Sequence, residues 1–117
     1  MLKVYQCEAR KKMIISKDEL VLNGWREVVA GSVDAAQEKH VPVVTKKCKS
    51  VQVDVGSVSH PMTEEHLIEW VAIETTAGYR VQYLKAGDVP VVKFSLGDEK
   101  LVGVYAYCNL HGLWKAD

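Results

Sequence analysis

The sequence predicts an all-β protein, built as a β-sandwich or a barrel. Runs of β-branched and aromatic residues recur along most of the chain, and turn signals separate them about every eight to twelve residues. The 117 residues are 48% hydrophobic and 26% charged, which is an ordinary globular composition and excludes a disordered chain. Helix is expected to be minimal.

Six strands are expected in the main part of the chain. The segment 51–55 alternates valine with Gln52 and Asp54, which is typical of a strand with one buried face. The segment 67–76 is longer and rich in β-branched and aromatic residues, and Ala77-Gly78 supplies the turn after it. The expected strands cover residues 41–45, 51–55, 67–76, 79–85, 91–96 and 101–108.

Two single helical turns are also expected. One begins at Asp34 and the other at Thr63, because both residues are favourable N-caps. The second turn would swing His66 back towards His60. The two turns cover residues 34–37 and 63–66.

The first 30 residues differ from the rest and are predicted to form a small β subdomain or arm. They are rich in charge, with short apolar runs at 13–15, 20–22 and 28–30. Asn23-Gly24 is a hairpin-type turn signal. Gly31-Ser32 is interpreted as a hinge, so that residues 31–117 make up the main domain.

Charge and cysteine content exclude several classes of protein. Fifteen basic and 15 acidic residues cancel, so the chain lacks the basic footprint of a nucleic-acid-binding protein. Its apolar runs are too short to span a membrane, and the N-terminus has no apolar signal core, so we expect a cytoplasmic protein. The three cysteines, Cys7, Cys48 and Cys108, are too sparse for a disulfide framework.

Four histidines and one cysteine stand beside expected strands. His60 and His66 precede one strand, His40 precedes another, and Cys108 and His111 follow the last long strand. Imidazole and thiolate are metal ligands, and the loops at one end of a sandwich can bring such residues together. Five donors exceed the four of a structural zinc site, so we expect an ion with an open position that suits a small anion.

Two other interpretations of these residues stay open. A single histidine is usually a surface residue, so the chain is alternatively a metal-free β-sandwich that binds another protein. The second alternative is a cupredoxin-like electron carrier, although that class needs a weak axial ligand, usually methionine, beyond the last histidine. No methionine follows His111.

Three motifs in this order resemble the superoxide reductases of the desulfoferrodoxin/neelaredoxin family. They lie at residues 33–43, 60–70 and 108–114, and the resemblance covers about residues 32–115. It implies an immunoglobulin-like β-sandwich and a mononuclear iron that reduces superoxide to hydrogen peroxide without producing dioxygen. It also implies the iron ligands, with an axial thiolate and four equatorial imidazoles: Cys108, His40, His60, His66 and His111.

The resemblance implies roles for two further residues. Lys39 resembles the lysine that draws superoxide in and orders a proton-delivering water. Glu38 resembles the glutamate that occupies the sixth position of the oxidised iron. Without the resemblance, this pair would be interpreted as a solvated loop pair. Trp70 and Trp114 are candidates for shielding the site, with core packing as the alternative for each.

The N-terminal region departs from the two-iron members of this family, which carry a second iron held by four cysteines. Cys7 resembles the first of these ligands, but Arg10 stands in the place of the second. Residues 1–30 are therefore interpreted as a desulforedoxin-like remnant without an iron site. The resemblance implies rubredoxin or a similar small protein as electron donor. It also implies a homo-oligomer, for which we favour a dimer over a tetramer. A further alternative is that iron is bound but serves only for sensing. Loss of superoxide turnover in Lys39→Ala with iron retained would argue against it.

Overall fold

The computed structural model describes residues 1–116, which form ten strands and one short helix. This content confirms the all-β prediction. The helix has four residues, so no helix in the described part of the chain is long enough to cross a membrane. The elements are β1 (Lys3–Cys7), β2 (Met13–Ser16), β3 (Trp25–Val28), α1 (Gln37–His40), β4 (Pro42–Lys47), β5 (Ser50–Val55), β6 (Ile68–Thr75), β7 (Gly78–Tyr83), β8 (Val91–Ser95), β9 (Leu101–Cys108) and β10 (Gly112–Lys115).

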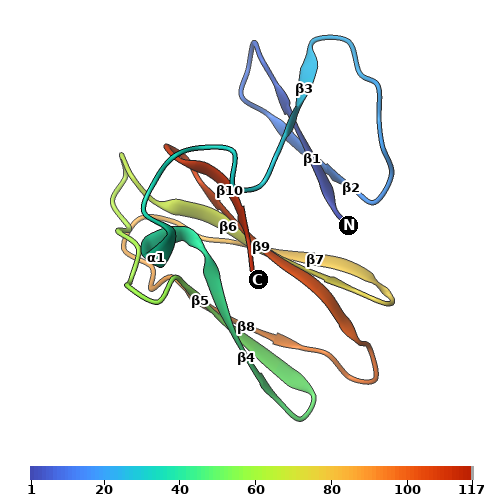
Figure 1. The fold of residues 1–117 in the computed structure, drawn as a ribbon, viewed down its shortest axis with the longest axis vertical. Coiled ribbons are helices and arrows are strands. Elements are labelled where there is room, and N and C mark those ends of the chain that lie inside the picture. Colours follow the sequence, from blue (N-terminus) through green and yellow to red (C-terminus); the bar gives the residue numbers. More distant parts are fainter. Residues whose placement is uncertain (117) are drawn as a thin grey trace.

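Two antiparallel sheets form the sandwich. One has the strand order β10-β9-β6-β7 and the other β4-β5-β8, and Figure 1 shows them below the N-terminal strands. The alternation at 51–55 is confirmed, since the three valines of β5 are buried while Gln52 and Asp54 are partly exposed. The core between the sheets consists mainly of β-branched and other aliphatic residues: Val51, Val53, Val55, Ile68, Val71, Ile73, Val92, Leu96, Val104 and Ala106, with Phe94 and Cys108.

The N-terminal strands form a third sheet with the order β2-β1-β3 (Figure 1). This sheet covers the outer face of β6 and β9, where Val4 packs with Trp70 and Tyr105 in a second apolar cluster. Two hydrogen bonds add to this contact. The Tyr79 hydroxyl donates to the Ile15 carbonyl at 3.0 Å, and the backbone N–H of Leu2 donates to the Tyr105 hydroxyl at 3.3 Å.

The strand predictions are more accurate than the predicted helical turns. The expected strand at 101–108 coincides with β9, whereas the apolar run at 20–22 forms no strand. The helix expected at 34–37 lies instead at Gln37–His40, and its N-cap is Ala36, which makes no side-chain cap. The prediction of Asp34 as N-cap is therefore wrong. Residues 63–66 form a bend and not a helical turn, and β10 was not expected.

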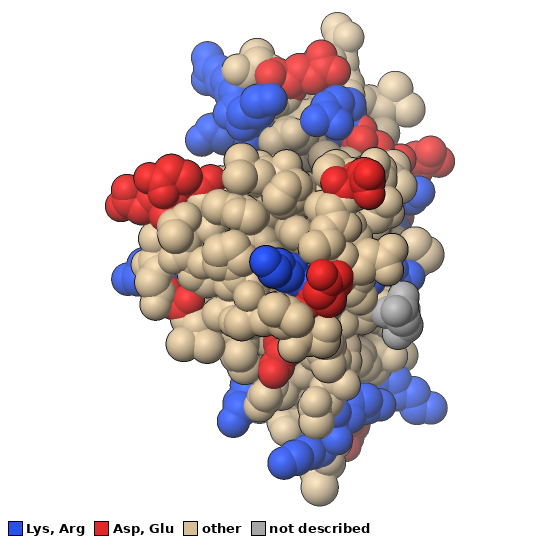
Figure 2. Space-filling view, turned by 60° about the vertical axis from the view of Figure 1, so that its left-hand side comes forward, with Lys and Arg blue, Asp and Glu red and all other residues tan. Residues whose placement is uncertain are grey.

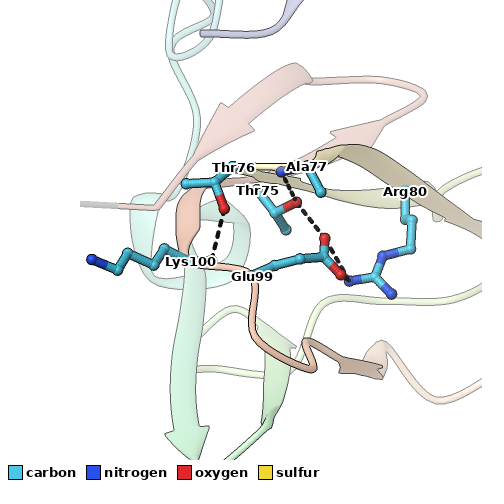
Figure 3. Close-up of polar contacts among 6 residues, drawn as sticks. All are labelled: Thr75, Thr76, Ala77, Arg80, Glu99 and Lys100. Carbon is cyan, nitrogen blue, oxygen red and sulfur yellow. Dashed lines mark hydrogen bonds and ion pairs between the residues drawn. The ribbon is translucent and has the colours of Figure 1, made fainter.

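A polar cluster closes the end of the sandwich where β6 finishes (Figure 3). The buried Thr75 hydroxyl donates to the Glu99 carboxylate at 2.5 Å and accepts from the Ala77 N–H at 3.1 Å. The Arg80 guanidinium pairs with the same carboxylate at 3.3 Å. Glu99 therefore fastens the turn between β8 and β9 to the β6–β7 hairpin.

Candidate metal centre

The five predicted ligand residues lie close together, four of them in one group of donor atoms and His60 outside that group but next to His40. His40 Nε2 lies 3.2 Å from His60 Nε2 and 3.1 Å from His111 Nδ1. The Cys108 sulfur lies 3.9 Å from His111 Nδ1. One donor atom each of His40, His66, Cys108 and His111 lies within 4.8 Å of the others. We call these residues the His/Cys cluster: His40, His60, His66, Cys108 and His111.

Different parts of the sandwich supply the members of the His/Cys cluster. His40 ends α1, Cys108 ends β9, and His111 lies in the turn before β10. His60 and His66 come from the connection between β5 and β6. His40, His60 and Cys108 are buried, whereas His66 and His111 are partly exposed. One side of the cluster therefore faces the surface.

Gly56 determines how closely α1 can approach the sandwich. A Cβ atom on Gly56 would lie 2.7 Å from the Glu38 carbonyl oxygen and 2.9 Å from that of Val41. The Glu38 carbonyl also accepts the Val58 N–H at 2.8 Å and the Ser57 hydroxyl at 3.3 Å. These contacts fix the backbone that carries Glu38, Lys39 and His40. The sequence marks Gly56 only as the end of a strand and gives no sign of this approach.

Backbone carbonyls orient two of the imidazole rings. His40 Nδ1 lies 2.6 Å from the Ala36 carbonyl, and His60 Nδ1 lies 2.6 Å from the Pro61 carbonyl. A carbonyl only accepts, so both Nδ1 atoms carry the proton and both Nε2 atoms present a lone pair. In His111 it is Nδ1 that faces the cluster. In His40 and His60 this is the pattern of a metal ligand oriented by its second nitrogen.

The donor atoms fit a metal cation. With both Nδ1 atoms protonated, the lone pairs of His40 Nε2 and His60 Nε2 face each other across 3.2 Å. Within residues 1–116, the buried Nε2 of His66 has no hydrogen-bond partner. Buried polar atoms without partners are costly, and a cation among them satisfies all of these lone pairs at once. Nitrogen and thiolate donors suit iron and other first-row transition metals.

Burial keeps the imidazoles ready for a metal. It lowers the pKa of His60 to about 4 and lowers the pKa values of His40 and His66, so these rings are neutral at pH 7. Burial raises the pKa of the Cys108 thiol, while hydrogen bonds from the N–H groups of Leu110 and His111 lower it. Burial is the larger effect, so the thiol is protonated until a metal displaces the proton.

Trp114 lies against the cluster, so its shielding role stays a prediction, whereas Trp70 lies in the core. The Trp114 ring stacks on His40 with centroids 5.0 Å apart, and its Nε1 donates to the His111 carbonyl at 3.0 Å. Trp70 stacks on Tyr107 at 5.7 Å in the apolar cluster beneath the N-terminal sheet, so it is a core residue.

Glu38 and Lys39 are both exposed on α1, directly before His40. Figure 2 shows the face of the molecule on the α1 side, where basic side chains gather mainly towards the two ends and the middle is mostly uncharged. Lys39 is therefore a basic side chain beside the His/Cys cluster, and the acidic Glu38 is its direct neighbour.

Comparison with known proteins identifies close relatives of this chain. The sequence model of the desulfoferrodoxin family matches residues 32–117. A desulfoferrodoxin of Clostridium acetobutylicum is 47% identical over 91 residues, which cover 78% of this chain and 71% of the relative. A desulfoferrodoxin of Syntrophotalea carbinolica is 39% identical over 99% of this chain and 96% of its own length. The crystal structure of the superoxide reductase from Treponema pallidum matches with a TM-score of 0.88 and 38% identity over 100% of this chain and 99% of that one.

Proposed function

The chain belongs to the desulfoferrodoxin family, and we propose that its His/Cys cluster holds the single iron of a superoxide reductase. The reaction takes up one electron and two protons per superoxide and yields hydrogen peroxide, with no dioxygen formed. The observation that supports this proposal best is the pair of inward lone pairs on His40 and His60, 3.2 Å apart. Bound ferrous iron would supply the electron and the Lewis acidity for the anion.

We propose that Lys39 draws superoxide to the site. Its ammonium group is exposed on α1, next to a site in which neutral imidazoles and one thiolate leave a divalent ion with a net positive charge. Both charges attract an anion, and steering of this kind raises the association rate. Lys39 can also hold a water molecule that delivers protons to the product.

Glu38 is proposed as the carboxylate that occupies the sixth position of the oxidised iron. Its backbone carbonyl is fixed by Val58 and Ser57, while its side chain is exposed and free to turn. A carboxylate on such an anchored backbone can approach the cluster without moving α1. Trp114 stacks on His40, and we propose that it keeps bulk water from that ring.

The electron donor is proposed to be a separate small protein such as rubredoxin. A four-cysteine iron centre cannot form in residues 1–30, because Cys7 is the one cysteine before Cys48. We therefore propose that this region is a remnant of a desulforedoxin-like domain. We also propose a homodimer, which the exposed apolar side chains of Val21 and Val29 in this region support. Sedimentation equilibrium tests the dimer.

Metal content and superoxide consumption test the function together. We expect one iron per chain, an absorption band of a ferric thiolate after mild oxidation, and superoxide consumption without dioxygen release. His60→Ala is expected to lose iron, whereas Gln82→Ala, which changes an exposed residue of β7, is expected to keep it. Copper in the purified protein would instead support an electron carrier. A protein that takes up no metal from ferrous salt without oxygen would contradict the enzyme function.

Lys39→Ala separates catalysis from iron binding. Lys39 is outside the His/Cys cluster, so the variant is expected to keep its iron and to react more slowly with superoxide. The loss should shrink as ionic strength rises, because salt screens the attraction in the unmodified protein. Unchanged superoxide turnover in this variant would contradict the proposed role of Lys39.

A further inference from the structure

The segment that carries His66 lies beyond the end of the sheet. Pairing between β6 and β9 stops at Ile68 and Cys108, and a register shift follows between Ile68 and Trp70. His66 precedes β6 by two residues, so no strand pairing holds it in place. Other contacts must therefore determine the distance between His66 and Cys108.

The side chain of Asn109 continues the pairing where the strands stop. Its Oδ1 accepts from the Leu67 N–H at 3.0 Å, and its Nδ2 donates to the Glu65 carbonyl at 2.9 Å. The backbone N–H of Asn109 donates to the Leu67 carbonyl at 3.2 Å. These three bonds hold the residues on both sides of His66. Asn109 itself follows Cys108 directly.

The ring of His66 depends on this backbone support more than the rings of His40 and His60 do. Carbonyl groups bind Nδ1 of His40 and of His60, whereas within residues 1–116 the hydrogen bonds of His66 are made by its backbone. Thr63 assists from the other side, since its hydroxyl accepts from the His66 N–H at 3.1 Å. Without the Asn109 amide, the segment would be tied down mainly at this bend.

We propose that Asn109 is a positioning residue of the metal centre, whose side-chain amide sets the place of His66 relative to Cys108 and His111. The inference rests on the proposed function, because it presumes that these residues bind iron. Asn109 does not itself bind the metal. It acts through the backbone of Glu65 and Leu67, as partners outside the ligand set of a metal site commonly do.

Asn109→Ala removes both side-chain bonds and leaves the ligands in the chain. The expected result is a loss of affinity for ferrous iron of about 10- to 100-fold, the usual effect of removing such a partner. The midpoint potential and the absorption band of the oxidised form are expected to shift as well, since the ligand geometry around the iron changes. A role in stability alone would leave potential and band unchanged.

The experiment compares the full-length unmodified protein with Asn109→Ala, Asn109→Asp and the control Gln82→Ala. Affinity is measured without oxygen by competition with a chromogenic chelator, the potential by redox titration, and folding of the metal-free protein by circular dichroism. The aspartate keeps the acceptor for the Leu67 N–H and loses the donor to Glu65. If Asn109→Ala does not fold, Asn109→Asp is used in its place. The expected loss of affinity for ferrous iron in Asn109→Asp is at least threefold.

The possible outcomes are distinct. Weaker iron binding and a shifted potential in folded Asn109 variants, with the control unchanged, support the inference. Affinity within twofold of the unmodified protein together with an unshifted potential overturns it and leaves the proposed function intact. Failure of the unmodified protein to bind ferrous iron overturns both.

Discussion

Replacing Gly56 with alanine is expected to displace α1 from the sandwich. The new Cβ would lie 2.7 Å from the Glu38 carbonyl oxygen, 2.9 Å from the Val41 oxygen and 3.1 Å from the Lys39 carbonyl carbon. All three neighbours are backbone atoms, so no side-chain rotation can relieve the overlap. Ordinary contact begins at 3.4 Å, and the helix backbone must therefore retreat by roughly 0.7 Å.

The consequences for the metal centre follow from what α1 carries. His40 is the last residue of α1 and Lys39 is the residue before His40 in the same helix. Both therefore move with the displaced backbone. Overpacking of this kind costs about 1–3 kcal/mol of folding stability. A misplaced ligand is expected to weaken ferrous iron binding by about 10- to 100-fold, which corresponds to about 1.4–2.7 kcal/mol.

The assay is chelator competition for ferrous iron on Gly56→Ala, with Gly103→Ala as the matched control. A Cβ at Gly103 meets only the Tyr105 side chain, at 3.2 Å, and that ring lies beneath the N-terminal sheet and away from the histidines. The control is expected to keep its iron affinity whatever it loses in stability. Iron affinity in Gly56→Ala within twofold of the unmodified protein would refute the argument that Gly56 places α1.

Three further changes test other parts of the structure. The pKa of His60 falls from 6.5 in the unfolded chain to about 4 on folding, so below pH 6.5 the unfolded metal-free chain binds the proton more readily. The free energy of unfolding of the metal-free protein therefore has its full value, as far as His60 is concerned, above about pH 6.5. It falls by on the order of 3 kcal/mol as the pH drops towards 4, which urea unfolding at several pH values would show. Glu99→Ala removes the acceptor of the buried Thr75 hydroxyl and is expected to cost about 1–3 kcal/mol; a urea midpoint equal to that of the unmodified protein would contradict the role of this cluster. Trp114→Leu removes the ring stacked on His40, and faster release of iron to a chelator is expected, whereas an unchanged rate would argue against shielding.

The strands could be predicted because their signals are local. The alternation at 51–55 lies within its strand, and the turn residues that bound 101–108 lie directly beside theirs. β5 and β9 end at the predicted residues. The helical turn was misplaced because its predicted N-cap, Asp34, makes no cap in the structure. The contacts of α1 with the strand ends decide its position, and no short sequence window contains them.

In the candidate site, too, some residues could be predicted from the sequence and others could not. The histidines and Cys108 were found because their types and their order along the chain carry the chemistry. Gly56 and Asn109 were not found as site residues, because each acts through backbone groups far away in the sequence. A glycine at a strand end and an asparagine in a turn are common, so composition alone cannot distinguish these two from others.

The N-terminal sheet is held against the sandwich by apolar packing, which does not require a metal. β6 is buried along both faces, with Glu69 as its one exposed residue, whereas a strand with one face in water would alternate. Its run of apolar residues therefore requires a layer on each side. The inner layer is the second sheet of the sandwich, and the outer layer is the sheet of β1, β2 and β3, which meets Trp70 and Ala72. This burial does not depend on an iron centre in the sheet of β1, β2 and β3, so the sheet stabilises β6, the strand that follows His66, without one.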